Sequence, residues 1–204
     1  MNHLEVYLDA DGVLYDYEGE YKRLTGGNPS EKGKVKSMRF KQFPRFYANL
    51  PLMPNAMRLW NYCKPLNHYV LTAASNYTPT SKEDKQHAFQ RDFNFGGSHL
   101  IIVNYPADKH KFAGPGKILV DDNAKNCDEW TRAGGIAIHH KSVEDTIRRL
   151  RVLYGHSEAT HVVETFQAIQ DTPNIIEVFQ SFPGRLETDC PNVVEALNIL
   201  NQMD

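Results

Sequence analysis

The sequence predicts an α/β protein in which a parallel sheet carries helices on both faces. Two observations favour this class: short apolar segments alternate with amphipathic segments, and three of the predicted strands end in polar residues. The 204 residues suit one ordinary domain with an appendage, and the hydrophobic content of 41% is normal for a globular protein. In such sheets, sites lie beyond the carboxyl ends of the strands.

Short apolar runs predict five strands, at residues 4–8, 68–72, 100–104, 117–120 and 136–139. Helical spacing of apolar residues predicts helices at 54–63, 81–93, 128–133 and 143–154. Gly134-Gly135 ends the third of these helices. Residues 1–154 are therefore predicted to form the main domain.

Between the first two strands, residues 18–49 are polar, basic and aromatic. We expect them to form a small helical cap inserted after the first strand.

The C-terminal segment, residues 155–204, repeats one pattern three times, beginning at Val162, Ile175 and Val193. Apolar residues at positions i, i+1, i+4 and i+7 predict three short amphipathic helices. The alternative is chance in a segment rich in Val, Ile and Glu. Eight acidic residues and one basic residue, Arg185, make this extension acidic. Short helices need a covering surface, so we expect the extension to pack on the domain or on a second subunit of a homodimer.

No run of 18 apolar residues is present, and the first residues have no signal-peptide pattern, so the sequence predicts no membrane association. Cys63, Cys127 and Cys190 are odd in number and lie far apart. They form neither a zinc spacing nor a disulfide framework, which favours a cytoplasmic protein.

Asp9-Ala10-Asp11-Gly12 directly follows the first predicted strand. A carboxylate at a strand end can attack phosphorus, and a second one two residues later can transfer the protons. Two carboxylates this close to a phosphate would repel it unless a cation neutralised them. Mg²⁺, which prefers oxygen ligands, is suited to that role. The alternative interpretation is an exposed turn, because Asp-Gly is a common turn pair.

Asp121-Asp122 forms a second acidic pair, at the end of the strand over 117–120. Adjacent carboxylates at a strand end are costly without a cation, although they could instead cap the following helix. Thr72 ends another strand and offers a hydroxyl to a phosphate oxygen, and the N–H of Ala73 adds a donor. Lys111 and Lys109 both precede Asp121, and either could neutralise a phosphate.

Four segments, DADGVLYD from Asp9, LTAAS from Leu71, Lys111 and ILVDD from Ile118, resemble in order the four motifs of the haloacid dehalogenase (HAD) superfamily of phosphatases. The resemblance covers about residues 4–150 and implies a Rossmann-like fold. The branch it resembles most is the 5′(3′)-deoxyribonucleotidase-like group, through the segment LPLMPNA from Leu50. Two residues depart from that group, Ala73 in place of serine and Asn55 in place of glycine.

The resemblance implies a role for each matched residue. Asp9 would be the nucleophile and a metal ligand, and Asp11 the general acid and base, with its backbone carbonyl on the metal. Asp122 would be the third protein ligand of the metal. Asp121 would either support these ligands from behind or reach the metal through a water molecule. Thr72, Ala73 and Lys111 would bind phosphate, and the spacing of that group favours Lys111 over Lys109.

A cap in this superfamily covers the site, so cap side chains are predicted to contact the substrate. The candidates are Tyr17, Arg39, Phe40 and Phe43, because aromatic faces beside cations suit a nucleobase and a phosphate. The alternative is that such aromatic residues form the cap's own core. His139-His140 is interpreted as structural, because adjacent strand residues point to opposite faces.

The sequence as a whole therefore predicts a Mg²⁺-dependent phosphomonoesterase that forms an aspartyl phosphate, with (deoxy)nucleoside monophosphates as substrates. One alternative is a 3′-phosphatase that acts on nucleic acid ends. Another is a non-catalytic module that binds a partner through its C-terminal helices.

Overall fold

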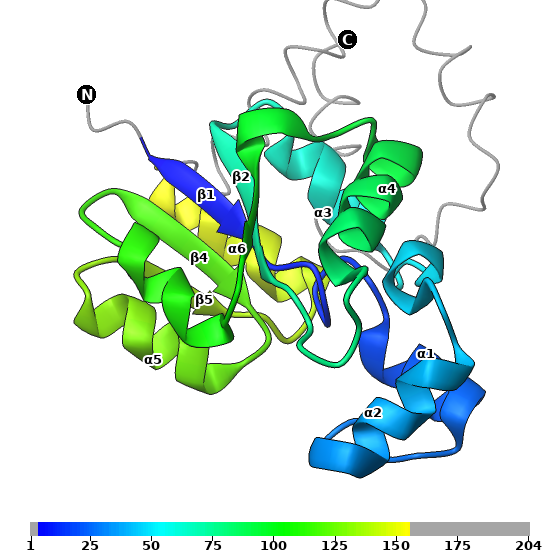
Figure 1. The fold of residues 1–204 in the computed structure, drawn as a ribbon. Coiled ribbons are helices and arrows are strands. Elements are labelled where there is room, and N and C mark those ends of the chain that lie inside the picture. Colours follow the sequence, from blue (N-terminus) through cyan, green and yellow to red (C-terminus); the bar gives the residue numbers. More distant parts are fainter. Residues whose placement is uncertain (1–3, 156–204) are drawn as a thin grey trace, which may run out of the picture. The chain divides into compact units, whose positions relative to one another are not determined.

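The structure, a computed structural model, describes residues 4–155. Five strands form one parallel sheet in the order β3-β2-β1-β4-β5 (Figure 1). The strands are β1 (Glu5–Leu8), β2 (His68–Ala73), β3 (Leu100–Val103), β4 (Lys117–Asp121) and β5 (Ile136–His139). This arrangement confirms the predicted Rossmann-like α/β class and all five predicted strands.

Helices connect the strands. Within the described residues they are α1 (Tyr17–Thr25), α2 (Gly33–Gln42), α3 (Ala56–Cys63), α4 (Ser81–Phe93), α5 (Ala124–Arg132) and α6 (Val143–Leu153). The same part of the chain also contains three short 3₁₀ helices, η1 (Phe46–Asn49), η2 (Gly97–His99) and η3 (Pro106–Phe112). None of the helices between residues 4 and 155 combines the length and apolar character needed to cross a membrane.

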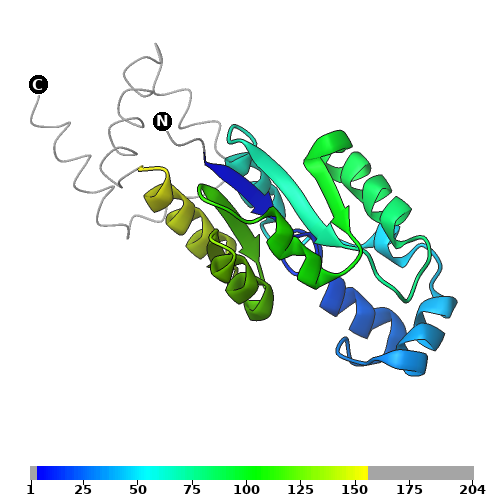
Figure 2. The ribbon, with the colours of Figure 1, turned by 60° about the vertical axis from the view of Figure 1, so that its left-hand side comes forward.

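The two faces of the sheet are buried by different helices, as the turned view shows (Figure 2). Val6 and Leu8 of β1 point into the larger core, which α3, α4 and α6 complete. Tyr7, between them, points into a smaller core on the other face, where α5 contributes Trp130. Because successive side chains of a strand alternate between faces, burial on both sides requires the continuous apolar run seen in β1.

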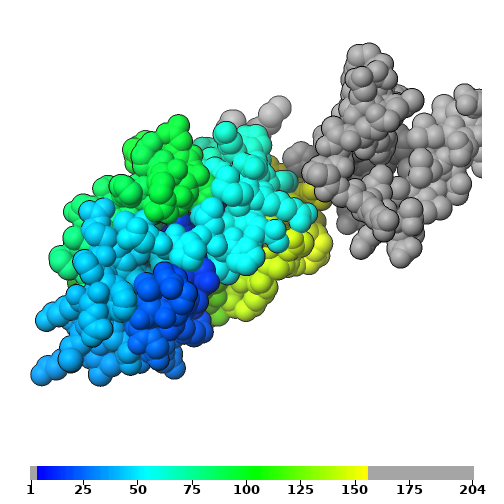
Figure 3. All heavy atoms as spheres, turned by 90° about the vertical axis from the view of Figure 1, so that its right-hand side faces the viewer, coloured from blue at the N-terminus to red at the C-terminus, as the bar shows by residue number. Residues whose placement is uncertain are grey.

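The cap consists of α1, α2 and η1 and lies beyond the carboxyl ends of the strands (Figure 1). In the space-filling view it forms one end of the described molecule (Figure 3). Asp16 accepts a hydrogen bond from the Gly19 N–H, which fixes the start of α1, and Gly26 ends the helix in the left-handed conformation. The insertion is therefore helical, as predicted.

One boundary differs by four residues. The helix predicted to begin at 128 begins at Ala124, because the Asn123 side chain accepts a hydrogen bond from the Lys125 N–H and caps the helix there. The three amphipathic helices predicted for the C-terminal extension lie outside the described residues.

Candidate functional site

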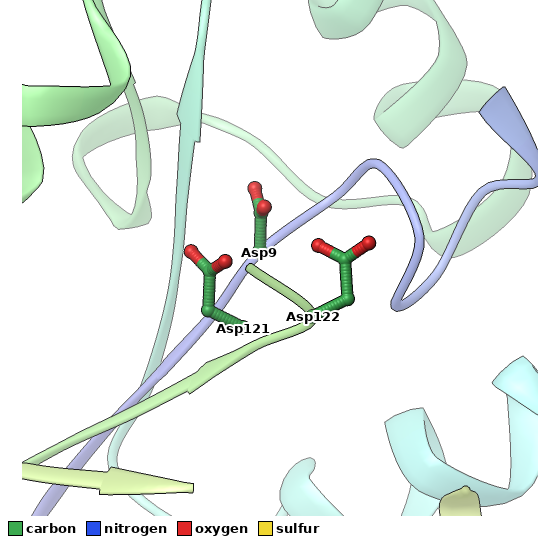
Figure 4. A group of neighbouring side chains, drawn as sticks. All are labelled: Asp9, Asp121 and Asp122. Atoms are coloured by element: carbon green, nitrogen blue, oxygen red, sulfur yellow. The ribbon is translucent and has the colours of Figure 1, made fainter. Parts of the chain in front are cut away.

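Two acidic strand ends meet at the carboxyl edge of the sheet. β1 and β4 are paired with Leu8 opposite Val120, so Asp9 and Asp121 follow at the same level. Asp122 completes a group of three, and ligand oxygens of the three residues lie within 4.8 Å of one another. Their carboxylates project to the same side of the chain (Figure 4). The sheet pairing thus brings together acidic residues more than 110 positions apart in the sequence.

Lys109 lies among these carboxylates. Its Nζ is 2.8 Å from Asp9 Oδ2 and 2.6 Å from Asp121 Oδ2, and the side chain is only 3% exposed. Burial acts to lower the pKa of Lys109, but the charges of Asp9 and Asp121 more than reverse this and raise it. Lys109 is therefore a fixed cation that orients the Asp9 carboxylate.

The structure does not place Lys111, the lysine that the sequence analysis favoured, at the acidic edge, where Lys109 lies instead. Lys111 forms an ion pair with Asp108 at 2.6 Å, and its side chain is 65% exposed. Both lysines belong to the 3₁₀ helix η3, in which three residues complete a turn. Two residues therefore separate the lysines by two-thirds of a turn, and only one of them can face the sheet edge.

The two members of the second acidic pair have different surroundings. Asp121 is fully buried and accepts hydrogen bonds from the Asn123 N–H, from Asn126 and from Lys109. The Asp122 carboxylate opens to the cavity, and no group in residues 4–155 donates a hydrogen bond to it. Desolvation, followed by the charges of Asp9 and Asp121, raises the pKa of Asp122 to about 7. Asp122 is thus the carboxylate that is free to take a cation.

Asp11 belongs to a second cluster, which the sequence analysis did not find. Both Asp11 carboxylate oxygens accept hydrogen bonds of 2.8 Å from Lys85, whose ammonium group also donates to Thr72 Oγ1 at 3.0 Å. Burial raises the pKa of Asp11, and Lys85 opposes this shift. Lys85 shares the buried face of α4 with Ala88 and Phe89. A lysine on the apolar face of a predicted helix is the signal that could have identified it.

Gly12 allows the chain to turn next to Asp122. Its φ is +80°, and a Cβ built on it would stand 2.1 Å from Asp122 Oδ2. A side chain at this position would therefore displace the carboxylate that is free to take a cation.

A cavity of about 590 Å³ joins these groups to the cap. Its lining includes Asp9, Asp11, Thr72, Ala73, Lys109 and Asp122, and from the cap Tyr17, Lys32 and Lys36. Thr72 and Ala73 thus reach the site from the end of β2, at the position the sequence predicts. A volume of this size is typical of sites for small molecules.

Of the four cap residues predicted to contact the substrate, only Tyr17 lines the cavity. Arg39 instead binds Glu31 at 2.7 Å and the Thr25 carbonyl. Phe40 is buried in the cap, and Phe43 packs against the same core. The structure therefore does not place these three residues at the cavity, because the two phenylalanines pack in the core and Arg39 is held by Glu31.

The two adjacent histidines are held by protein groups. His139 Nε2 lies 2.8 Å from the Asp122 carbonyl, and His140 Nδ1 lies 2.8 Å from Thr146 Oγ1. Their different partners fit the interpretation of this pair as structural.

The donor set at the sheet edge suits a hard divalent cation. Every candidate ligand atom is an oxygen, and several carboxylates crowd together with one lysine between two of them. The same edge presents the buried Asp9 carboxylate and the partly buried Asp11 carboxylate in one cavity. The arrangement can bind a phosphate group only if positive charge offsets these anions.

No protein-family model and no curated protein matches the chain. Among solved structures, an L-2-haloacid dehalogenase from Xanthobacter autotrophicus is 14% identical, with a TM-score of 0.46 over 77% of this chain and 85% of that chain. A hydrolase from Streptococcus pneumoniae TIGR4 is 10% identical, with a TM-score of 0.45 over 74% and 99% of the two chains. A hydrolase from Pseudomonas syringae is 14% identical, with a TM-score of 0.39 over 72% and 97%. Likenesses at this level carry no argument about activity, so function rests on the geometry of the site.

Proposed function

We propose that this protein is a cytoplasmic, Mg²⁺-dependent phosphomonoesterase of the HAD type that acts through an aspartyl phosphate. The observation that carries the proposal is the position of Asp9. Its carboxylate ends the central strand, is held by Lys109 at 2.8 Å, and shares one cavity with Asp11. A fixed nucleophile beside a proton donor is what cleavage of a phosphate ester requires.

The first half of the reaction uses both aspartates. An Asp9 oxygen attacks the phosphorus atom and forms an oxygen–phosphorus bond as the bond to the leaving oxygen breaks. Asp11 gives its proton to that leaving oxygen. Burial raises the pKa of Asp11, and Lys85 opposes this shift.

In the second half, Asp11 removes a proton from water, and the water oxygen attacks the phosphorus of the aspartyl phosphate. The bond from phosphorus to Asp9 breaks, so inorganic phosphate leaves and the Asp9 carboxylate is restored. Lys109 and the Thr72 hydroxyl supply hydrogen-bond donors to the phosphate oxygens throughout. Lys85 holds Asp11 toward the cavity in both halves.

Asp9, Asp122 and the backbone carbonyl of Asp11 are the groups proposed to hold Mg²⁺, with Asp121 fixing Lys109 beside them. When bound, the ion supplies positive charge that offsets the repulsion between the carboxylates and the phosphate. The crowded carboxylates and the raised pKa of Asp122 support the need for such charge.

We expect activity to require a divalent ion. EDTA should stop phosphate release, and Mg²⁺ in excess should restore it. Ca²⁺ should restore it poorly, because its larger and looser coordination shell misplaces the nucleophile. Full turnover in metal-free buffer would contradict the proposed site.

We place the substrates among (deoxy)nucleoside monophosphates. Tyr17 supports this, because its aromatic side chain lines the cavity that also contains the proposed phosphate-binding groups. The direct experiment is to measure phosphate release from mononucleotides, sugar phosphates and 3′-phosphorylated oligonucleotides. A clear preference for sugar phosphates would contradict the nucleotide assignment, and no release from any of them would leave the non-catalytic alternative.

Gly12→Ala should strongly reduce the rate of phosphate release, while its effect on the free energy of unfolding should be modest. The methyl group would lie on Asp122 Oδ2, so the carboxylate must move away from the site. Gly26→Ala is the matched control, because Gly26 also has a positive φ but a Cβ there meets nothing within 4 Å. Each substitution should cost about 1–2 kcal/mol in the free energy of unfolding, measured in urea. Equal activity of the two variants would show that Asp122 has no role.

A further inference from the structure

Lys36 of α2 lines the same cavity as the two catalytic aspartates, but it comes from the cap. Its Nζ stands 5.4 Å from the ring centroids of Tyr17 and Tyr21 and 5.5 Å from that of Tyr77. It donates a hydrogen bond of 2.5 Å to the Pro29 carbonyl. A lysine ammonium group has three N–H donors, so this contact leaves donors for a further acceptor.

The Lys36 ammonium group is half-buried without an anionic partner. Among residues 4–155 no carboxylate forms an ion pair with it, and Glu31, the largest opposing charge, is held by Arg39 at 2.7 Å. Burial lowers the pKa of Lys36. Burying a cation without an anion costs free energy, which ring faces and one carbonyl offset only in part. An anion entering the cavity would stabilise this group.

Tyr77 docks this part of the cap onto the main domain. It belongs to the loop between β2 and α4, and its hydroxyl accepts a hydrogen bond of 3.2 Å from the Gly33 N–H at the start of α2. Its ring also stacks on Phe40 of the cap, with 6.2 Å between centroids. Lys36 is therefore held at the cavity by contacts from both the cap and the domain.

From this geometry we infer that Lys36, with Lys32 beside it in the cavity lining, binds a second phosphate of the substrate. The preferred substrates are then phosphomonoesters that carry another phosphate nearby. That group is either the second phosphate of a nucleoside 3′,5′-bisphosphate or the phosphodiester next to the end of an oligonucleotide. The inference rests on the proposed phosphomonoesterase function, and it moves the preferred substrate from a nucleoside monophosphate to a phosphomonoester that carries a second phosphate. An anion is favoured over a neutral acceptor, because charge-assisted hydrogen bonds are the stronger ones.

The test compares the binding of thymidine 3′,5′-bisphosphate with that of thymidine 5′-monophosphate by calorimetry in Mg²⁺. The full chain carries Asp9→Asn, so that neither ligand is consumed. We expect the bisphosphate to bind about tenfold more tightly or better, the contribution of a hydrogen bond to a charged group. Lys36→Met in this background should reduce the difference to about twofold or less. Lys34→Met is the matched control, because Lys34 is exposed on the same helix outside the cavity, and it should keep the preference.

The inference is overturned if the two ligands bind with equal affinity or if neither binds. It is also overturned if the preference for the bisphosphate survives Lys36→Met. Lys36→Gln should give the same result as Lys36→Met, and circular dichroism identifies a variant that has failed to fold. Rates of phosphate release from a 5′-phosphorylated dinucleotide and from the bisphosphate are then compared. The faster substrate identifies whether the second phosphate is a phosphodiester or a phosphomonoester. A chain that releases no phosphate from any substrate refutes the proposed function, while the binding difference still tests Lys36 by itself.

Discussion

Asp9→Asn is expected to abolish phosphate release while the fold remains intact. The amide has nearly the shape of the carboxylate, but it cannot attack phosphorus and is a poorer metal ligand. Loss of the nucleophile should reduce the rate by about 10³-fold or more. Phosphate release under saturating substrate and circular dichroism give the two readouts.

The matched control is Asp108→Asn, which makes the same change in a carboxylate that pairs with Lys111 outside the site. It should leave the rate unchanged. Mass spectrometry of acid-quenched enzyme should find the phosphoryl group on the peptide that contains Asp9. Retention of more than a few per cent of activity in Asp9→Asn would contradict the covalent mechanism.

Lys109→Met should damage both stability and activity. Lys109 is buried and touches two carboxylates, so its removal leaves Asp9 and Asp121 buried without their cation. Breaking a buried ion pair from one side costs about 3–5 kcal/mol in the free energy of unfolding. The remaining folded protein should bind phosphate esters poorly, because a donor to the phosphate oxygens is lost. Urea unfolding and the KM for the best substrate give the two measurements.

Lys111→Met is the control for this prediction. Lys111 is exposed and its partner Asp108 is on the surface of η3, so the free energy of unfolding should change by about 0.5 kcal/mol or less. If Lys111→Met damaged turnover more than Lys109→Met did, the assignment of Lys109 to the site would be wrong.

The positions of the acidic residues could be predicted from the sequence, because they depend only on where strands end. Asp9 follows the apolar run of β1, and Asp121 ends that of β4. In a parallel sheet these ends share one edge, so the carboxylates meet whatever the details of the connecting helices. The same reasoning placed Thr72 and Ala73 at the site.

The lysines could not be assigned in the same way. Whether Lys109 or Lys111 faces the edge depends on the helical phase of η3, which a polar segment without an apolar repeat does not reveal. Lys85 comes from a helix that begins nine residues after Thr72, and its contact with Asp11 depends on how α4 packs on the sheet. Such contacts depend on side-chain direction, which a pattern of residue types constrains only weakly.

By itself, therefore, the sequence determined the α/β class, the five strands and the acidic edge, because apolar runs and strand ends are local features. Only the tertiary structure decided which lysines contact the carboxylates at that edge and which cap residues face the cavity. Arg39, Phe40 and Phe43 were matched to a substrate by residue type, yet they contact other cap residues. The physical reason is that a small cap buries its aromatic side chains before it can offer any to a ligand. Tyr17 and Lys36 are among the cap residues that do line the cavity, and the contacts of Tyr77 with α2 hold Lys36 there.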